Sequence, residues 1–156
     1  MSGFLVDYEI AHLVTGGYIT SQRDEDLLQY VNPCSFDITL GSSLMYESPS
    51  AARWVDSVSI DQEPYILKPG ELVLAHSDVY IKIPKHMKWD FVMKSSTARS
   101  GLNHQLAGLL DPGFEGTITL ELTNDLRYHG LVLKAGMKIG QVVFYDLGKE
   151  PDTAIS

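Results

Sequence analysis

The chain has 156 residues, which suits one domain with a sizeable hydrophobic core, and we expect a single domain over residues 1–156. Hydrophobic residues make up 44% of it and charged residues 21%, the balance of an ordinary soluble globular protein. No window approaches the apolar length of a membrane span, and the first residues lack the basic-then-apolar order of a signal peptide. We therefore expect a cytoplasmic protein without a membrane partner.

The charge excludes further classes. Twenty acidic residues outnumber 12 basic ones, so the net charge of -8 argues against a nucleic-acid-binding surface, while a local basic pocket still suits a single nucleotide. Cys34 is the sole cysteine, and the five histidines show no pair at metal-ligand spacing. We expect neither an internal disulfide nor a zinc site. We interpret Cys34 as a small packed residue rather than a nucleophile.

The first predicted element is a short helix near the N-terminus. Asp7 is suited to cap it and the pair Gly16-Gly17 to end it, with three apolar residues on one face: Ile10, Leu13 and Val14. A first strand follows over residues 35–40, where polar and apolar residues alternate until Gly41.

The middle of the chain predicts further short strands over residues 65–67, 71–76, 79–83 and 89–94. A Leu-Lys-x-Gly pattern at residues 67–70 recurs at residues 133–136, each time before an apolar strand. Two such hairpins indicate a doubled β-architecture of the jelly-roll kind, and regularly spaced strands with Gly and Pro turns indicate an all-β sandwich or barrel.

Residues 94–101 contain the parts of an anion site. Lys94 and Arg99 are cations, and the hydroxyl residues between them can cap a short helical turn that Gly101 would close: Ser95, Ser96 and Thr97. Such a turn points backbone N–H groups outward, which suits phosphate.

Residues 111–123 follow with a turn and a strand. Asp-Pro-Gly at 111–113 predicts a tight turn, because proline presets one dihedral and glycine is free to take positive φ. Residues 117–123 alternate strictly, which places Glu121 on a polar face among threonines. A carboxylate there is a candidate catalyst. The same pattern also fits a serine-rich turn and a hairpin with Glu121 as a solvated strand residue.

Three motifs resemble, in order and spacing, the signature of the dCTP deaminases in the trimeric dUTPase-like superfamily. They are Lys-Ser-Ser-Thr-Ala-Arg-Ser-Gly-Leu at 94–102, Asp-Pro-Gly-Phe-Glu-Gly at 111–116 and Ile-Thr-Leu-Glu-Leu at 118–122. Gly-Met-Lys-Ile-Gly-Gln at 136–141 is similar to members that also release pyrophosphate. The resemblance implies an all-β distorted jelly roll or β-barrel with a short N-terminal helix, assembled as a homotrimer with its sites between subunits.

The resemblance also implies roles for individual residues. Glu121 matches the catalytic glutamate, and Ser95 and Arg99 match residues that complete the site from a neighbouring subunit. Asp111 matches a sugar contact, and Phe114 would pack on the deoxyribose and crowd out a 2′-hydroxyl. The remaining implied contacts to the nucleotide are Lys94, Ser96, Thr97, Ala98, Thr119, Leu120 and Gln141. Any Mg²⁺ would only bridge phosphates.

One departure concerns the end of the sequence. Family members usually continue past the last core strand, whereas this sequence stops at Ser156. We therefore expect that the phosphates are held elsewhere, that the substrate has fewer of them, or that binding is weak. Three functions stay open. The first is deamination of a deoxycytidine nucleotide, dCTP to dUTP, with or without onward cleavage to dUMP and pyrophosphate. The second is a dUTP diphosphatase that activates water with Asp111, and the third is a catalytically weak nucleotide-binding trimer. A glutamate at 121 favours the first.

Overall fold

The computed structural model of the chain describes all residues except 1–2, 50–53, 55–57, 105–107 and 154–156. It is built mostly of strands, as the sequence predicted. The elements in chain order are β1 (Gly3–Phe4), α1 (Asp7–Thr15), β2 (Ile19–Ser21), the 3-10 helix η1 (Leu27–Tyr30), β3 (Phe36–Tyr46), β4 (Val58–Ser59), β5 (Tyr65–Leu67), β6 (Leu72–Lys82), β7 (Met87–Met93), α2 (Ser95–Arg99), β8 (Leu102–His104), β9 (Gly108–Leu110), β10 (Glu115–Asn124), β11 (Leu131–Leu133) and β12 (Lys138–Asp146).

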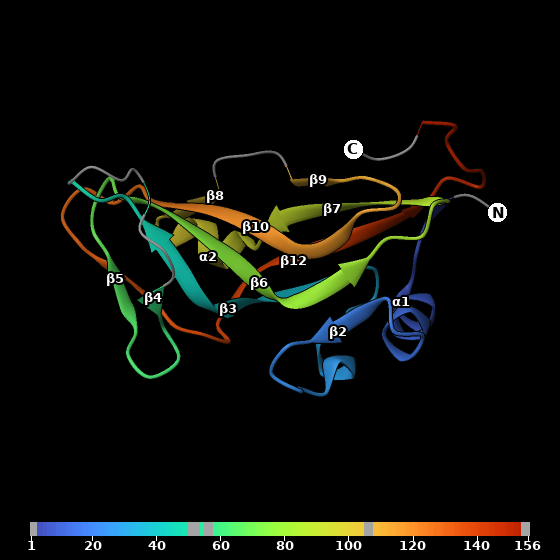
Figure 1. Ribbon diagram of the computed structural model, residues 1–156, viewed down its shortest axis with the longest axis horizontal. Helices are drawn as coiled ribbons and strands as arrows, with labels where there is room; N and C mark the ends of the chain where they lie inside the picture. The colour runs from blue at the N-terminus through green and yellow to red at the C-terminus, as the bar shows by residue number, and fades with distance from the viewer. Residues whose placement is uncertain (1–2, 50–53, 55–57, 105–107, 154–156) are drawn as a thin grey trace.

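Ten strands form one antiparallel sheet whose main path runs β8-β10-β6-β3-β12-β7-β9 (Figure 1). Short strands extend it: β1 pairs with β12, β2 with β6, and β4 with β3. The sheet curls into an open half-barrel around the core, where Trp89 and Phe144 meet edge to face at 4.7 Å between ring centroids. Both rings are almost fully buried, and burial of one such side chain stabilises the fold by about 1.5–3 kcal/mol.

The repeated Leu-Lys-x-Gly pattern marks two turns of the same geometry. Gly70 and Gly136 have φ of 79° and 86°, and each turn is closed by a backbone hydrogen bond, from Glu71 to Lys68 (3.0 Å) and from Met137 to Lys134 (3.2 Å). Positive φ at the third residue is the type II geometry that favours glycine. The strands before the two turns, β5 and β11, pair with each other. The doubled arrangement that the repeat predicted is therefore present.

The helix α1 was predicted correctly, but its cap differs. Asp7 is the first helical residue rather than the N-cap, which is Val6. Glu9 takes over the capping function, because its Oε1 accepts a hydrogen bond of 3.0 Å from the Val6 N–H. The helix ends before Gly16, as expected, and buries Ile10 and Leu13.

Two other expectations were wrong. The strand β3 does not end at Gly41 but continues to Tyr46. Gly41 is needed there for a close approach, since an added Cβ would lie 2.2 Å from Cε1 of the His76 ring on β6. Cys34 is exposed rather than packed, because it lies in the turn that precedes β3.

Candidate active site

The strand β10 carries the candidate catalytic residue, and a bulge in its neighbour β6 fixes its position. The register shifts between Thr117 and Thr119, so that the β6 residues around Ser77 oppose a single residue, Ile118. The Ile118 N–H donates to the Ser77 hydroxyl at 2.9 Å, and this hydroxyl donates to the Val79 carbonyl at 2.8 Å. The buried serine thus satisfies the backbone group that the bulge releases. The sequence had suggested a break at this point between two strands.

Beyond the bulge, β10 alternates as predicted. Leu120 is fully buried in the core, while Thr119 is exposed and Glu121 half-buried on the opposite face. Glu121 lies opposite Leu74 of β6, and Thr119 lies opposite His76. Within the described part of the chain, no hydrogen bond or ion pair engages the Glu121 carboxylate.

The outer face beside Glu121 contains a shallow hollow of about 270 Å³. His76 is its main polar group. The His76 Nδ1 lies 2.8 Å from the Ser77 carbonyl, to which it donates, and Nε2 lies 3.2 Å from the Ser43 hydroxyl. The hollow is lined by Ser43, Leu44, Met45, Leu74, Ala75, His76 and Thr119.

The Asp-Pro-Gly segment forms the predicted tight turn just before β10. Gly113 has φ of 85°, and the Phe114 N–H donates to the Asp111 carbonyl at 3.2 Å. Two further backbone bonds tie the turn to Ile83, which directly follows β6. The Asp111 side chain is exposed. Phe114 is half-buried and packs against the core.

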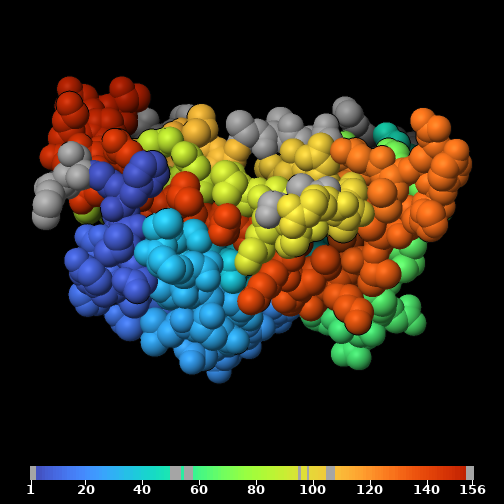
Figure 2. Space-filling model, turned by 180° about the vertical axis from the view of Figure 1, so that it is seen from behind, coloured from blue at the N-terminus to red at the C-terminus, as the bar shows by residue number. Residues whose placement is uncertain are grey.

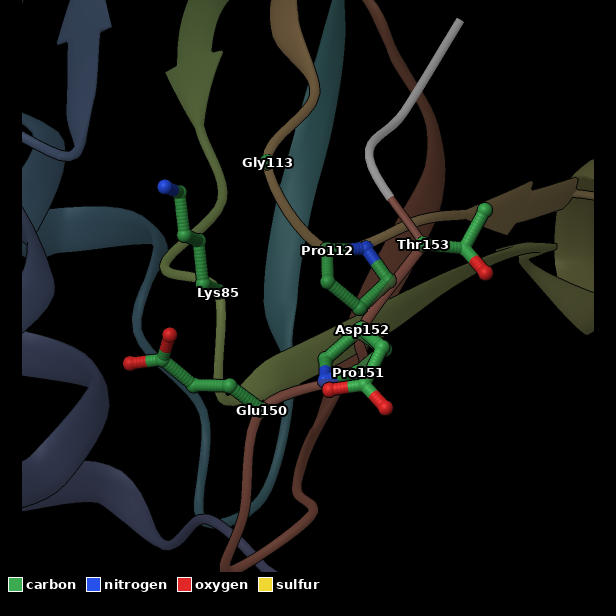
Figure 3. Close-up of a pocket in the computed structure, with 7 residues that line it drawn as sticks. All are labelled: Lys85, Pro112, Gly113, Glu150, Pro151, Asp152 and Thr153. Carbon is green, nitrogen blue, oxygen red and sulfur yellow. The ribbon is translucent and has the colours of Figure 1, made fainter.

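A pocket of about 260 Å³ lies beside this turn, where Pro112 and Gly113 face the C-terminal segment (Figure 3). Its other lining residues are Lys85, Glu150, Pro151, Asp152 and Thr153.

The predicted helical turn is present as α2, directly after β7. The Ser100 N–H and hydroxyl both bond to the Thr97 carbonyl, at 3.1 and 2.6 Å, and Gly101 follows with φ of 101°. Leu126, in the connection after β10, covers Gly101 so closely that an added Cβ would lie 2.4 Å from its Cγ. Figure 2 shows the yellow atoms of this segment on the molecular surface beside the orange residues that follow β10.

The residues of α2 differ in how far they are described. Ser96 and Arg99 are exposed and Thr97 is half-buried, whereas the side chains of Ser95 and Ala98 lie outside the described part of the structure. The described ion pairs include neither Arg99 nor Glu121, so the structure does not join these two residues within one chain.

Lys94 and Gln141, by contrast, both contact one cluster of polar residues, formed by Asn32, Ser35 and Asp37. The Lys94 Nζ lies 2.7 Å from Oδ1 of Asp37 on β3, and the Gln141 Oε1 accepts a hydrogen bond of 3.0 Å from Ser35. Asn32 Nδ2 donates to both Asp37 (2.9 Å) and Ser35 (3.2 Å). Sequence reasoning missed these three polar residues. The sequence alternates there, which suggested a polar face, whereas Ser35 and all residues of β3 from Phe36 to Gly41 are buried.

Over the ranges that the structure describes, no three or more His, Cys, Asp and Glu side chains are close enough to share an ion. Over the same ranges, no helix is long and apolar enough to cross a membrane.

Solved structures with a similar fold define the structural class. The deoxycytidine triphosphate deaminase from Agrobacterium tumefaciens aligns with a TM-score of 0.78 and 22% identity over 93% of this chain; this chain spans about half of that protein, 49%. The native dUTPase of EIAV aligns with a TM-score of 0.52 and 18% identity, covering 100% of this chain and 97% of the dUTPase. The fold is therefore that of the dCTP deaminases and dUTPases, as the sequence motifs implied.

The sequence comparisons narrow this class to one family. Residues 4–147 match the family described as dCTP deaminase-like. A protein from Methanospirillum hungatei named "dCTP deaminase, dUMP-forming" is 35% identical over 153 residues, which cover 90% of this chain and 80% of the relative. A protein of the same name from Bifidobacterium animalis subsp. lactis is 37% identical over 155 residues, covering 92% of this chain and 79% of the relative. The chain belongs to the dCTP deaminase-like family.

Proposed function

We propose that the protein deaminates dCTP hydrolytically and carries the product on to dUMP and pyrophosphate. The observation that carries the proposal is the Glu121 carboxylate, which is half-buried on the outer face of β10 and engaged by no described side chain. Support comes from relatives at 35% and 37% identity that are named "dCTP deaminase, dUMP-forming".

The proposed chemistry uses one carboxylate in three proton transfers. Glu121 takes a proton from water as the oxygen attacks C4 of cytosine, and this proton is passed to N3. The proton of the new C4 hydroxyl is then passed through Glu121 to the amino nitrogen. The bond from C4 to this nitrogen breaks, ammonia leaves, and the C4 carbonyl of uracil remains. A group that serves in turn as base and acid must lie between the water and the ring. The bulge opposite Ile118 favours this, because it sets the register of β10 three residues before Glu121.

We further propose that Arg99 and Ser95 complete the site from a neighbouring subunit of a homotrimer. Arg99 is exposed, so its guanidinium is available to a second chain. A guanidinium beside Glu121 would orient the carboxylate by a charge-assisted hydrogen bond.

The proposed nucleotide contacts follow the surface of the turn and of α2. The exposed Asp111 would bind the deoxyribose hydroxyl, and Phe114 would pack against the sugar. Ser96, Thr97 and Ala98 on α2, with Lys94 before it, would hold phosphate. Thr119 and the backbone of Leu120 would read the base edge, and Gln141 would donate to the nucleotide.

We propose that Mg²⁺ enters only as a bridge between phosphates of the substrate, that zinc takes no part, and that the reaction occurs in the cytoplasm. A single cysteine cannot supply the ligands of the cysteine-rich deaminase zinc site. Full deamination after treatment with a zinc-specific chelator is the expected result. Loss of turnover that added zinc restores would contradict this part of the proposal.

The deciding experiment incubates the protein with dCTP, dCMP and dUTP, measures ammonia and separates the nucleotides. Ammonia release from dCTP with accumulation of dUMP and pyrophosphate is the expected outcome. Cleavage of dUTP without ammonia release from either cytosine nucleotide would instead indicate a dUTP diphosphatase. Binding without any turnover would indicate a nucleotide-binding trimer.

A further inference from the structure

Three polar side chains, two just before β3 and one at its start, form a connected network with two of the proposed nucleotide contacts. Ser35 and Asp37 are buried, and Asn32 beside them is half-buried. Buried polar groups of this kind fix one arrangement when every member is satisfied.

The hydrogen bonds in this network run in one direction, from the Asn32 amide through Ser35 to Gln141. Burial by itself would raise the pKa of Asp37, but hydrogen bonds from Lys94 and Asn32 and the charges of Lys94 and Lys138 outweigh it and hold the pKa below its ordinary value. The ionised carboxylate only accepts, so the Asn32 amide that faces it must present its NH₂ group. The same NH₂ group donates to the Ser35 hydroxyl, and the single Ser35 proton is then directed to Gln141 Oε1.

This direction determines what Gln141 can offer a ligand. Because its Oε1 accepts from Ser35, its NH₂ group is the end left to donate, and none of the described residues accepts from it. Gln141 is half-buried on β12, with Asp37 of β3 and Val92 of β7 as its direct strand neighbours. A ligand at this position therefore meets a donor rather than an acceptor.

The same carboxylate also holds the cation that precedes α2. Asp37 Oδ1 lies 2.7 Å from Lys94 Nζ, and Oδ2 lies 3.5 Å from Lys138 Nζ at the start of β12. Only 5% of the Asp37 side chain is exposed, against 28% for Lys94, so the carboxylate is the fixed partner and the ammonium lies at the edge of the network.

We propose that Asn32, Ser35 and Asp37 are positioning residues that hold Gln141 with its NH₂ group toward an acceptor oxygen of the nucleotide and hold Lys94 at the start of α2. The inference rests on the proposed function for the identity of the ligand. It adds to it a specific relay, from Asp37 through Asn32 and Ser35 to Gln141.

A double-mutant cycle tests the relay, because a residue that acts only through Gln141 has nothing left to affect once Gln141 is gone. Ser35→Ala is expected to raise KM for dCTP roughly 5–10-fold and to change kcat less than about twofold, the size of one lost hydrogen bond. Gln141→Ala is expected to raise KM for dCTP by at least the same factor. The double variant should bind no worse than Gln141→Ala alone.

Ser21→Ala is the matched control. Ser21 has a comparable set of bonds outside the Asp37 network: its hydroxyl donates to Asp78 at 2.7 Å and accepts from the N–H groups of Arg23 and Glu25, each at 3.1 Å. Ser21→Ala should lower the melting temperature and leave KM for dCTP unchanged, both in the wild-type background and when combined with Gln141→Ala. Should Ser35→Ala fail to fold, Asn32→Ala serves in its place, since it frees the Ser35 proton from its fixed direction.

The outcomes separate this inference from the proposed function. If wild type releases ammonia from dCTP but the effects of Ser35→Ala and Gln141→Ala add, the relay is wrong and the deaminase proposal stands. If wild type releases none, the deaminase proposal fails, and the cycle is measured as Kd for dCTP and dUTP by calorimetry. If the effects of Ser35→Ala and Gln141→Ala on Kd are coupled, the relay is supported; if these effects add, the relay is overturned. Absence of nucleotide binding by wild type overturns both.

Discussion

Glu121 of β10 lies directly opposite Leu74 of β6, so the candidate catalytic carboxylate has an aliphatic side chain as its cross-strand neighbour. A structural carboxylate on a sheet is usually paired with a cation or an amide, as Asp37 is in this protein. The environment of Glu121 therefore fits a group that meets its partners only when a substrate or a second subunit arrives.

Glu121→Gln is expected to lower ammonia release from dCTP roughly 10³–10⁴-fold, the upper part of the range for a general acid–base group, because the amide keeps the shape but accepts no proton. Fold and nucleotide affinity should be close to wild type. Glu115→Gln, an exposed residue at the start of the same strand, is the control and should retain activity. Near-normal ammonia release by Glu121→Gln, measured by a coupled ammonia assay, would show that another group is the base.

A site shared between subunits makes a prediction that a single-chain site does not. Arg99→Ala and Glu121→Gln should each be inactive, but purified trimers that contain both kinds of chain should recover about a third of wild-type activity, because one of their three interfaces has both native residues. Arg127→Ala, which removes another exposed arginine, should remain active by itself.

The mixed sample is prepared by co-expression with two different tags and tandem purification, and its mass is checked by light scattering. No recovery in purified mixed trimers would place Arg99 and Glu121 in the same chain. A stable, fully active monomer at micromolar concentration would contradict the trimer itself.

Local sequence patterns were enough to predict the alternation of one strand and three turns, but not the end of β3. The alternation of β10 and the glycine turns at Gly70, Gly113 and Gly136 follow from period and backbone freedom, and they were predicted correctly. The end of β3 was not. Gly41 looks like a strand terminator until the His76 ring, 35 residues away, is known to lie against it.

The network at Asp37 shows the same limit for the site. Lys94 was predicted as a phosphate-binding cation, but no local pattern indicated that a carboxylate 57 residues earlier lies 2.7 Å from it. The contact depends on β12 pairing with both β3 and β7, which is a long-range property of the sheet. The roles of Glu121, Ser95 and Arg99 stay predictions.

The close approach at Gly41 gives a test of the fold itself. Gly41→Ala should lower the free energy of unfolding by roughly 1–3 kcal/mol, the usual cost of overpacking, because the new methyl group overlaps the His76 ring. His76→Ala removes the ring, so the double variant should be more stable than the two separate losses predict. Urea unfolding of the four proteins measures the coupling, and strictly additive losses would mean that the ring does not lie over Gly41.

Asp37 predicts how stability depends on acid. Its pKa in the folded protein lies below the ordinary value of 3.8, so the stabilisation from its ionised form is present above about pH 4 and is lost as the pH falls through the folded pKa. Asp37→Asn should cost roughly 1–3 kcal/mol at pH 7, because it leaves the Lys94 ammonium without its charged acceptor. The difference from wild type should shrink steadily below pH 4, where wild-type Asp37 becomes protonated.

Asp90→Asn, which breaks the more exposed pair with Lys88, is the control and should cost less than about 1 kcal/mol both at pH 7 and below pH 4. Urea titrations from pH 2.5 to 7 measure all three proteins, and a cost for Asp37→Asn that stays constant over this range would contradict the assignment of Asp37 as the ionised centre of the network.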